Sequence, residues 1–272
     1  MHRKGILVAA ALCASISATA GASVVDTTPG LLYHLDAGVG VTNIANAVSN
    51  WADANGNGVN FAQAVAAKQP ALFPTNAAFN GKPTVRFDGD LTGNAAGVAP
   101  NADRLVSATP ATSVQTVILV ASTFQHRQLD GVWGLNNGDT GIRRKDANTW
   151  QTTANGGNTN DFPTSTIING TTTFTEPLNT PSILIATGNS TTLAATGLGE
   201  YFQVGTNTPR PWNGDLAEVA VFNRTLTASE IQSIDTFLGS KYNITVAPEP
   251  TSLSLLGVAT LGLLARRRRT GH

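Results

Sequence analysis

The chain has 272 residues, one cysteine and a formal net charge of zero. Six of its 17 basic residues lie at the two ends (Arg3, Lys4, Arg266, Arg267, Arg268 and Arg269), and the rest of the chain has 11 basic residues against 17 acidic ones. This acidic excess argues against nucleic acid or an anionic membrane as a partner, because both need a basic surface.

The first 22 residues predict a signal peptide. A basic start, His2 to Lys4, precedes an apolar stretch from Ile6 to about Ile16. Ala18-Thr19-Ala20 and Ala20-Gly21-Ala22 both fit the small-x-small pattern that signal peptidase cuts. We therefore expect the protein to be exported, and Cys13 to leave with the signal peptide, so that the mature protein has no disulfide.

Residues 23–245 predict one all-β domain. Many Asn, Thr, Gly and Ala residues favour short strands joined by turns. Six segments carry the alternating or continuous apolar pattern of strands: 30–38, 81–90, 113–123, 129–135, 181–188 and 213–223. The most hydrophobic of them, 113–123, predicts a central strand that is buried on both faces. Residues 148–175 are polar and indicate edge strands with long loops.

The stretch DANGNG at 53–58 matches the opening of a calcium-binding loop. Its first, third and fifth positions are oxygen-bearing: Asp53, Asn55 and Asn57. The closing bidentate glutamate should stand at position 12, where this chain has Ala64. Two hypotheses therefore stay open, a weak calcium site to which Asp88 and Asp90 add oxygens, or a plain Asx-turn. The pattern predicts no other cofactor.

Three aromatic residues are candidates for carbohydrate binding: Trp150, Trp212 and Tyr201. An exposed aromatic ring can cover a sugar, and amide-rich loops around Trp150 and Trp212 supply polar groups. Trp150 stands in NTWQTT without an apolar neighbour, so we expect it to be exposed. The alternative for each tryptophan, Trp133 included, is packing in the core or at an interface.

One amphipathic helix is predicted near the C-terminus. Thr227 and Glu230 form the T-x-x-E pattern of a capping box. Apolar residues follow at helical spacing: Ile231, Ile234, Leu238 and Tyr242. The helix should lie on the sheet after the last strand.

The tail at 246–272 combines three ordered features. Pro248, Glu249 and Pro250 precede an apolar stretch from Leu253 to Ala265, and four arginines follow it. Thirteen helical residues span roughly 20 Å, short of the hydrocarbon core of about 30 Å. The tail thus predicts a short transmembrane helix with Arg266–Arg269 on the cytoplasmic side. It resembles the PEP-CTERM sorting signal of Gram-negative bacteria. The resemblance implies temporary anchoring in the inner membrane and cleavage near the motif by an exosortase.

Three stretches resemble bacterial concanavalin A-like, LamG-type domains: WADANGNG at 51–58, GKPTVRFDG at 81–89 and WNGDLAEVAVFNRTLTASEIQSIDTFLGSKYNI at 212–244. The last one joins a Gly-Asp-x-x-Glu strand, an Asn-Arg-x-Leu turn and a helix ending in Lys-Tyr. The resemblance implies an antiparallel jelly-roll β-sandwich. Because this fold carries lectins, adhesive modules and glycanases alike, it leaves the function open.

Catalysis has little support in the sequence. Retaining glycanases of this fold carry E-x-D-x-x-E on one strand, with carboxylates about 5 Å apart, and no glutamate here belongs to such a pattern. We expect Glu218 to be structural, pairing with Arg224 or accepting hydrogen bonds from a loop. A less favoured alternative makes Glu218, Asp88 or Asp90 catalytic. His34 is expected in the core or at its rim, and His126 in a solvated loop.

The sequence therefore predicts an exported, non-catalytic protein of the cell envelope or extracellular matrix. Its expected partners are an exosortase and an extracellular polysaccharide, bound by a lectin-like β-sandwich. Two alternatives remain, an adhesive matrix protein that contacts other proteins and a divergent glycan-cleaving enzyme.

Overall fold

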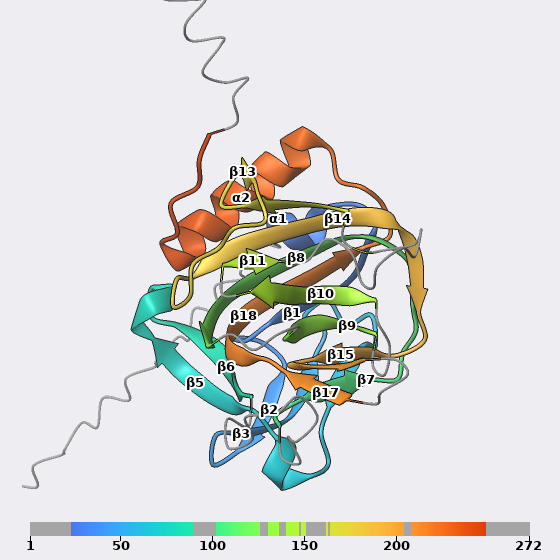
Figure 1. Cartoon of the computed structure of the whole chain (residues 1–272), viewed down its shortest axis with the longest axis vertical. Helices are drawn as coiled ribbons and strands as arrows, with labels where there is room; N and C mark the ends of the chain where they lie inside the picture. Colours follow the sequence, from blue (N-terminus) through green and yellow to red (C-terminus); the bar gives the residue numbers. More distant parts are fainter. Residues whose placement is uncertain are drawn as a thin grey trace, which may run out of the picture.

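Antiparallel strands make up most of the structure. The computed structural model describes residues 23–89, 102–125, 130–135, 140–146, 148–150, 162, 164–203 and 208–248. Every strand pair among these residues is antiparallel, which confirms the predicted all-β class. Figure 1 shows the strands wrapped around a common interior, with the two α-helices gathered on one side.

The strands of the first half are mostly short, with one long exception. They are β1 (Leu31–Asp36), β2 (Val41–Ile44), β3 (Ala47–Ala52), β4 (Asn60–Ala62), β5 (Ala71–Asn76), β6 (Lys82–Asp88), β7 (Leu105–Ser107), β8 (Ala111–Gln125) and β9 (Gly131–Leu135). Two α-helices and two 3-10 helices are described along the chain: α1 (Val24–Thr27), α2 (Ala228–Tyr242), η1 (Ala66–Lys68) and η2 (Ala77–Phe79).

The second half adds nine strands: β10 (Gly141–Asp146), β11 (Thr149–Trp150), β12 (Ser165–Ile168), β13 (Thr171–Thr172), β14 (Ser182–Leu193), β15 (Thr196–Leu198), β16 (Glu200–Gln203), β17 (Thr208–Pro211) and β18 (Asn213–Phe222). Within the described ranges, one 16-stranded sheet runs in the order β11-β10-β9-β15-β7-β4-β3-β5-β6-β18-β8-β14-β12-β13, with β1 on β18 and β2 on β3. β16 and β17 form a separate hairpin.

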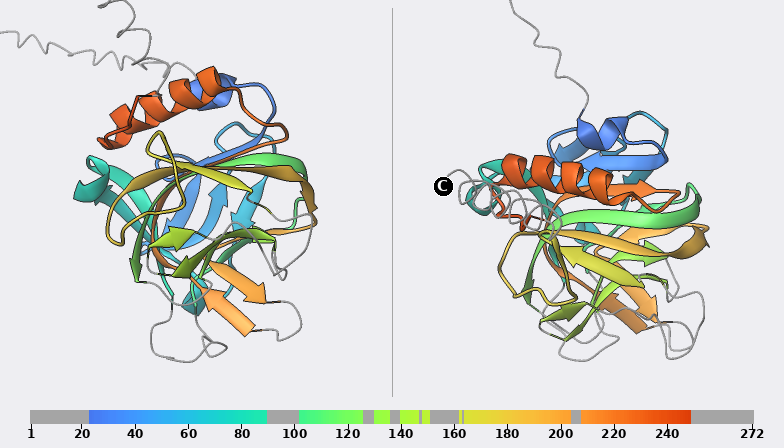
Figure 2. Two further views of the ribbon diagram at one scale, coloured as in Figure 1. Left: turned by 45° about the horizontal axis from the view of Figure 1, so that its top comes forward. Right: turned by 90° about the horizontal axis from the view of Figure 1, so that it is seen from above.

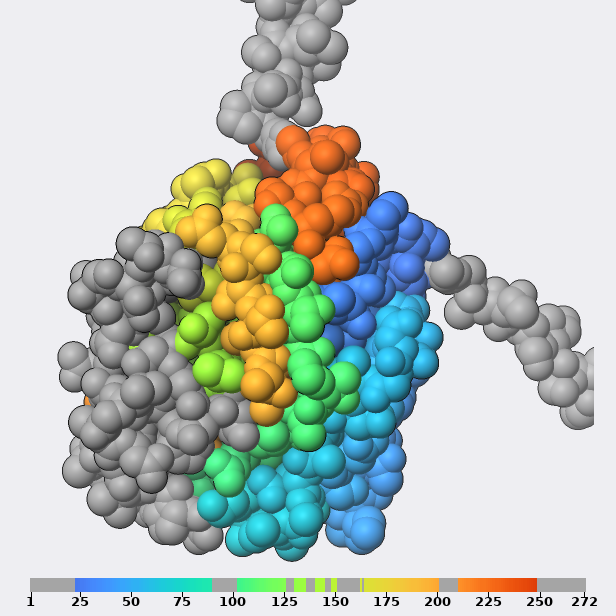
Figure 3. Space-filling model, turned by 90° about the vertical axis from the view of Figure 1, so that its right-hand side faces the viewer, coloured from blue at the N-terminus to red at the C-terminus, as the bar shows by residue number. Residues whose placement is uncertain are grey.

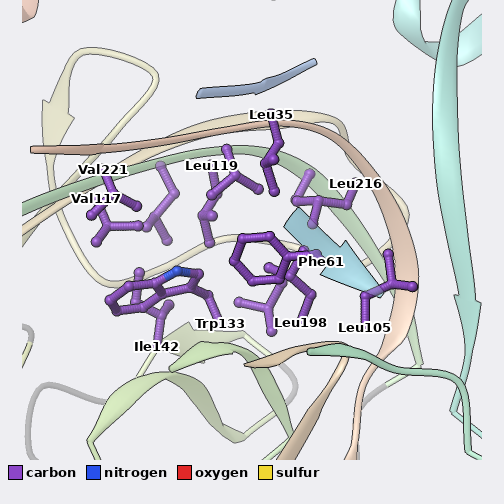
Figure 4. Packing of buried hydrophobic residues seen from close by; sticks show 14 of the residues in the cluster. Leu35, Phe61, Leu105, Val117, Leu119, Trp133, Ile142, Leu198, Leu216 and Val221 are labelled. Carbon is purple, nitrogen blue, oxygen red and sulfur yellow. The ribbon is translucent and has the colours of Figure 1, made fainter. Parts of the chain in front are cut away.

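The main core lies between two facing parts of this sheet. Figure 4 shows Val117 and Leu119 of β8 opposite Trp133 of β9 and Ile142 of β10. All four side chains are buried. Burial of each such side chain contributes about 1.5–3 kcal/mol, so this cluster is the principal source of stability of the domain.

The strand β8 is buried on both faces, as its hydrophobic sequence predicts. Successive side chains of a strand point to opposite faces, so Ile118 and Val120 leave the main core and join a second hydrophobic cluster. That cluster lies between the sheet and α2. The layers are therefore helix, sheet and sheet, in that order.

The helix α2 has the predicted start and the predicted apolar stripe. The Thr227 side chain accepts from the Glu230 backbone N–H, and the Glu230 side chain accepts from the Thr227 backbone N–H, which completes the capping box. Ile234, Leu238 and Tyr242 are buried against the sheet. The prediction of a C-terminal amphipathic helix is confirmed.

Both ends of the described chain lie on the side that carries the helices (Figure 2). Ser23 caps α1, and Pro248 follows α2 after a short segment. The signal peptide and the tail helix predicted from the sequence lie outside the described residues. Within those residues, no helix combines the length and the apolar character needed to span a membrane.

Candidate functional site

A buried cluster of charged side chains lies between the sheet and the helices. Tyr33 and Leu35 of β1 point into the main core, so His34 and Asp36, which alternate with them, project from the opposite face. Asp36 is the direct antiparallel partner of Glu218 in β18. The last turn of α2 brings Lys241 and Tyr242 to the same place.

Glu218 stands at the centre of this cluster. Its Oε1 lies 2.6 Å from His34 Nε2, while its Oε2 accepts hydrogen bonds from Lys241 Nζ and Tyr242 OH, each at 2.7 Å. Lys241 Nζ also donates to Asp36 Oδ2 at 2.7 Å. Burial would raise the pKa of Glu218, but the hydrogen bonds and charges of His34 and Lys241 hold it below its usual value.

His34 joins Glu218 to the N-terminal helix. Its Nδ1 lies 2.6 Å from Asp26 Oδ1 of α1. An ionised carboxylate only accepts hydrogen bonds, so a ring held between two of them carries a proton on both nitrogens. Burial would lower the pKa of His34, but Glu218 and Asp26 raise it above its usual value. The imidazolium therefore links α1 to β18.

The partners of Glu218 differ from those expected from the sequence. Arg224 contacts Glu230 of α2 instead, with its NH1 2.9 Å from Oε2. Glu218 points towards the helices from the middle of β18, whereas Arg224 follows the end of that strand. The expectation that Glu218 pairs with Arg224 is wrong. Side chains of a strand point alternately to its two faces, and Glu218 is on the face that meets His34, Lys241 and Tyr242.

The His34 cluster predicts a defined dependence of stability on pH. The raised pKa of His34 makes its contribution complete below about pH 6.5 and progressively lost above it, by at most about 1.4 kcal/mol per pH unit. The pKa of Asp26 is lowered, since hydrogen bonds from Ser23 and His34 outweigh burial, so its contribution is lost in acid. The free energy of unfolding should peak between about pH 4.3 and 6.5.

Urea unfolding at pH 5.5 and pH 8.5 measures this difference. We expect the free energy of unfolding to be lower at pH 8.5, and the difference to shrink in His34→Gln, which has no proton to lose. An equal difference in the variant and the parent would assign the pH dependence to other groups.

A second buried ion pair lies at the other side of the main core. Arg144 of β10 donates from NH1 to Glu176 Oε2 at 2.8 Å and from NH2 to the Glu176 backbone O at 2.7 Å. Both side chains are almost fully buried. Burial raises the pKa of Glu176 from its usual value, against the attraction of Arg144. This arrangement fixes β10 and β11 to the segment before β14.

The prediction that Trp150 is exposed is wrong. Trp150 is only 2% exposed, its indole N–H donates to Glu176 Oε2 at 2.8 Å, and Arg144 Cζ lies 4.8 Å from its ring centroid. Trp212 is fully buried and donates to Thr123 Oγ1 at 3.0 Å. Neither indole offers a face to a sugar, because both rings are buried by segments distant in sequence.

Three other candidate residues lie partly or wholly outside the described residues. Tyr201 belongs to β16, and its side chain is not among the described ones. Asp90 and His126 are not described. The sugar-binding role of Tyr201 therefore stays a prediction, as does a catalytic role of Asp90.

The Asp53 side chain accepts hydrogen bonds from the loop at 53–58 and from β1. Asp53 Oδ1 accepts the backbone N–H of His34 at 2.8 Å and of Asn55 at 3.2 Å, and Oδ2 accepts that of Asn57 at 2.7 Å. These bonds use both oxygens of the carboxylate, and the donors are those of an Asx-turn. The weak calcium site at Asp53, Asn55 and Asn57 stays a prediction. Among the described residues, no three His, Cys, Asp or Glu side chains are placed to hold a metal ion.

The segment that leads into the tail is docked on the domain. After α2 the chain turns at Asn243, whose φ is 56°, and Ile244 N–H donates to Gly239 O at 2.9 Å. Val246 joins the second hydrophobic cluster. Ala247 N–H donates to Asn169 O, in the turn between β12 and β13, at 2.8 Å. The first residue of the Pro-Glu-Pro motif, Pro248, therefore follows a fixed segment directly.

Comparison with protein families concerns this C-terminal end. Residues 246–269 match the family model described as the PEP-CTERM protein-sorting motif. The tail is a PEP-CTERM sorting signal. It includes Pro248, Glu249 and Pro250 together with Arg266–Arg269, and it marks an exported protein that an exosortase processes during membrane transit. The match covers the tail alone, so it says nothing about the ligand of the domain.

Similarity to solved structures is distant. The chain matches Trypanosoma rangeli sialidase in complex with sialic acid at 16% identity and a TM-score of 0.43, and Trypanosoma rangeli sialidase at 13% and 0.41. Each match covers 81% of this chain and 34% of the sialidase, so the chain spans about one third of its length. With TM-scores below 0.5, neither match bears on activity. No curated protein matches the chain.

Sequence reasoning missed most partners of the two buried clusters. Asp26, Asp36 and Arg144 gave no local signal, because each acts through a contact with a distant segment. Lys241 and Tyr242 did give one, since the Lys-Tyr pair ends the stretch that resembles LamG-type domains. In the structure, both residues of that pair donate hydrogen bonds to Glu218.

Proposed function

We propose that this is a non-catalytic protein of the Gram-negative cell envelope or extracellular matrix, whose domain binds extracellular polysaccharide. The observation that carries the proposal is the sorting signal directly after a folded β domain. The antiparallel sheet with its capping helix supports a jelly-roll β-sandwich of the concanavalin A-like, LamG type. An exosortase would release such a domain from its anchor.

The non-catalytic assignment is supported by how the buried acids are used. Glu218 holds His34, Lys241 and Tyr242, and Glu176 holds Arg144. Most glycosidases use two carboxylates that reach the same glycosidic bond. Carboxylates committed to internal ion pairs do not offer this.

Tyr201 is the aromatic residue left as a sugar-binding candidate, on the hairpin β16–β17. We expect the mature protein to bind at least one glycan on an array that is run with and without calcium. Tyr201→Ala should lower binding at least tenfold without changing the Tm, whereas Tyr201→Phe keeps the ring and should retain binding. Trp150→Phe, which leaves a buried ring, serves as the control for folding defects.

Two other results would replace this proposal. Absence of a glycan signal together with capture of an envelope protein would favour an adhesive role. Val39, Ile44 and Val65 favour that reading, since they are 50%, 78% and 52% exposed in segments around β2–β4, and Ile44→Ser should then weaken capture. Release of reducing ends from purified exopolysaccharide would instead identify an enzyme.

A further inference from the structure

The groove between α2 and the β12–β13 hairpin is shaped for the segment Ile244–Ala247, here called the clip. Figure 3 shows the last described residues, in dark red, between the helix in orange and the hairpin in yellow. A cavity of about 390 Å³ continues the groove, lined among others by Ile167, Ile231 and Pro248. The clip therefore lies at an open edge of the domain.

Two glycines make room for the clip. A Cβ on Gly170 would come within 2.3 Å of Ala247 O and 2.9 Å of Val246 Cγ1. A Cβ on Gly239 would come within 2.8 Å of Val246 Cγ2 and 2.9 Å of Ile244 O. Glycine weakens the interior of a helix, so its place at 239 is explained by the close approach of the clip.

The hairpin side of the groove is rigidly tied to the sheet. Asn169 donates its backbone N–H to Ile183 O at 3.0 Å, and its Oδ1 accepts Ile183 N–H at 2.8 Å. Its own carbonyl is thereby oriented to accept Ala247 N–H. With φ values of 50° for Asn169 and 78° for Gly170, the turn is of the tight hairpin type.

We propose that the clip fixes the sorting motif at the domain surface and sets the upstream limit of exosortase processing. A protease must draw an extended chain into its active site, and the residues up to Ala247 are held by the domain. Cleavage therefore falls at or after Pro248. The mature protein keeps the clip as part of its second hydrophobic cluster. This inference rests on exosortase processing and is independent of the ligand of the domain.

The test compares two glycines in equivalent turns. Gly170 and Gly81 both follow an asparagine with positive φ, and their own φ values are 78° and 73°. A Cβ on Gly81 meets nothing within 4 Å. Gly81→Ala thus imposes the same backbone strain as Gly170→Ala without touching the clip. Gly239→Ala is a second variant, which favours the helix while displacing the clip.

The full-length chain is expressed in a Gram-negative host with an exosortase, and the C-terminus of the mature protein is read by intact mass. We expect the parent and Gly81→Ala to end at or after residue 248. Gly170→Ala and Gly239→Ala should give mixed C-termini that include cuts between residues 243 and 247. A parent protein that ends at or before Ala247, or the same C-terminal residue in the parent and all three variants, would overturn the proposal.

Hydrogen exchange on the unprocessed chain gives a second readout that needs no exosortase. The Ala247 amide should exchange at least tenfold faster in Gly170→Ala than in Gly81→Ala, while the two variants have the same Tm. An unprotected Ala247 amide in the parent would refute the docked clip. A protected amide with no processing in cells would refute exosortase sorting of this chain instead, so the two failures are distinguishable.

Discussion

Glu218→Gln is expected to lower the free energy of unfolding by about 3–5 kcal/mol. The substitution keeps the shape of the side chain but removes the charge that faces His34 and Lys241 in a buried site. For a domain of this size the Tm should fall by roughly 6–20 °C. Differential scanning calorimetry of the purified mature protein measures it.

Glu230→Gln is the matched control for this experiment. It makes the same chemical change in a partly exposed ion pair with Arg224, and glutamine still completes the capping box. Its Tm should stay close to that of the parent, because exposed pairs contribute little. Equal Tm shifts in the two variants would contradict a central role of Glu218. Any loss of activity in Glu218→Gln has to be judged against this loss of stability.

Glu176→Gln is expected to have an effect of similar size, about 3–5 kcal/mol. Arginine keeps its proton at every pH at which the protein is folded, so Arg144 would stay charged after losing its carboxylate partner. The bond from Trp150 can persist to the amide oxygen. Urea unfolding at pH 7 measures the change in free energy.

Arg144→Met removes the other partner of the same buried ion pair. It leaves Glu176 buried, but a carboxylate can take up a proton, and burial already raises the pKa of Glu176. The loss should therefore be smaller than in Glu176→Gln and should decrease as the pH is lowered. A greater loss in Arg144→Met, or one that does not vary with pH, would show that this account of the pair is wrong.

Features that depend on local pattern could be predicted from the sequence. The capping box at Thr227 and Glu230 and the continuous apolar run of β8 act through residues a few positions apart, and both predictions are confirmed. The sorting signal also consists of three adjacent features and is confirmed by the family match. A motif of residues that lie close together in the sequence is sufficient evidence in such cases.

Features that depend on contacts between distant segments could not be predicted. Trp150 has polar neighbours in sequence, yet its partner Glu176 follows 26 positions later. His34 and Glu218 are 184 positions apart. Nothing in either local stretch specifies the other residue, so the exposure of an aromatic ring and the partner of a glutamate were decided by the topology of the sheet.

The position of the two chain ends has a consequence for the precursor before cleavage. Ser23 caps α1 and Pro248 lies beside α2, whereas the hairpin β16–β17 lies at the far end of the domain from the two α-helices (Figure 2). A tail held in the lipid would keep the helix side next to the bilayer and direct that hairpin away from the membrane. The hairpin would then be accessible to other molecules even before the protein is released.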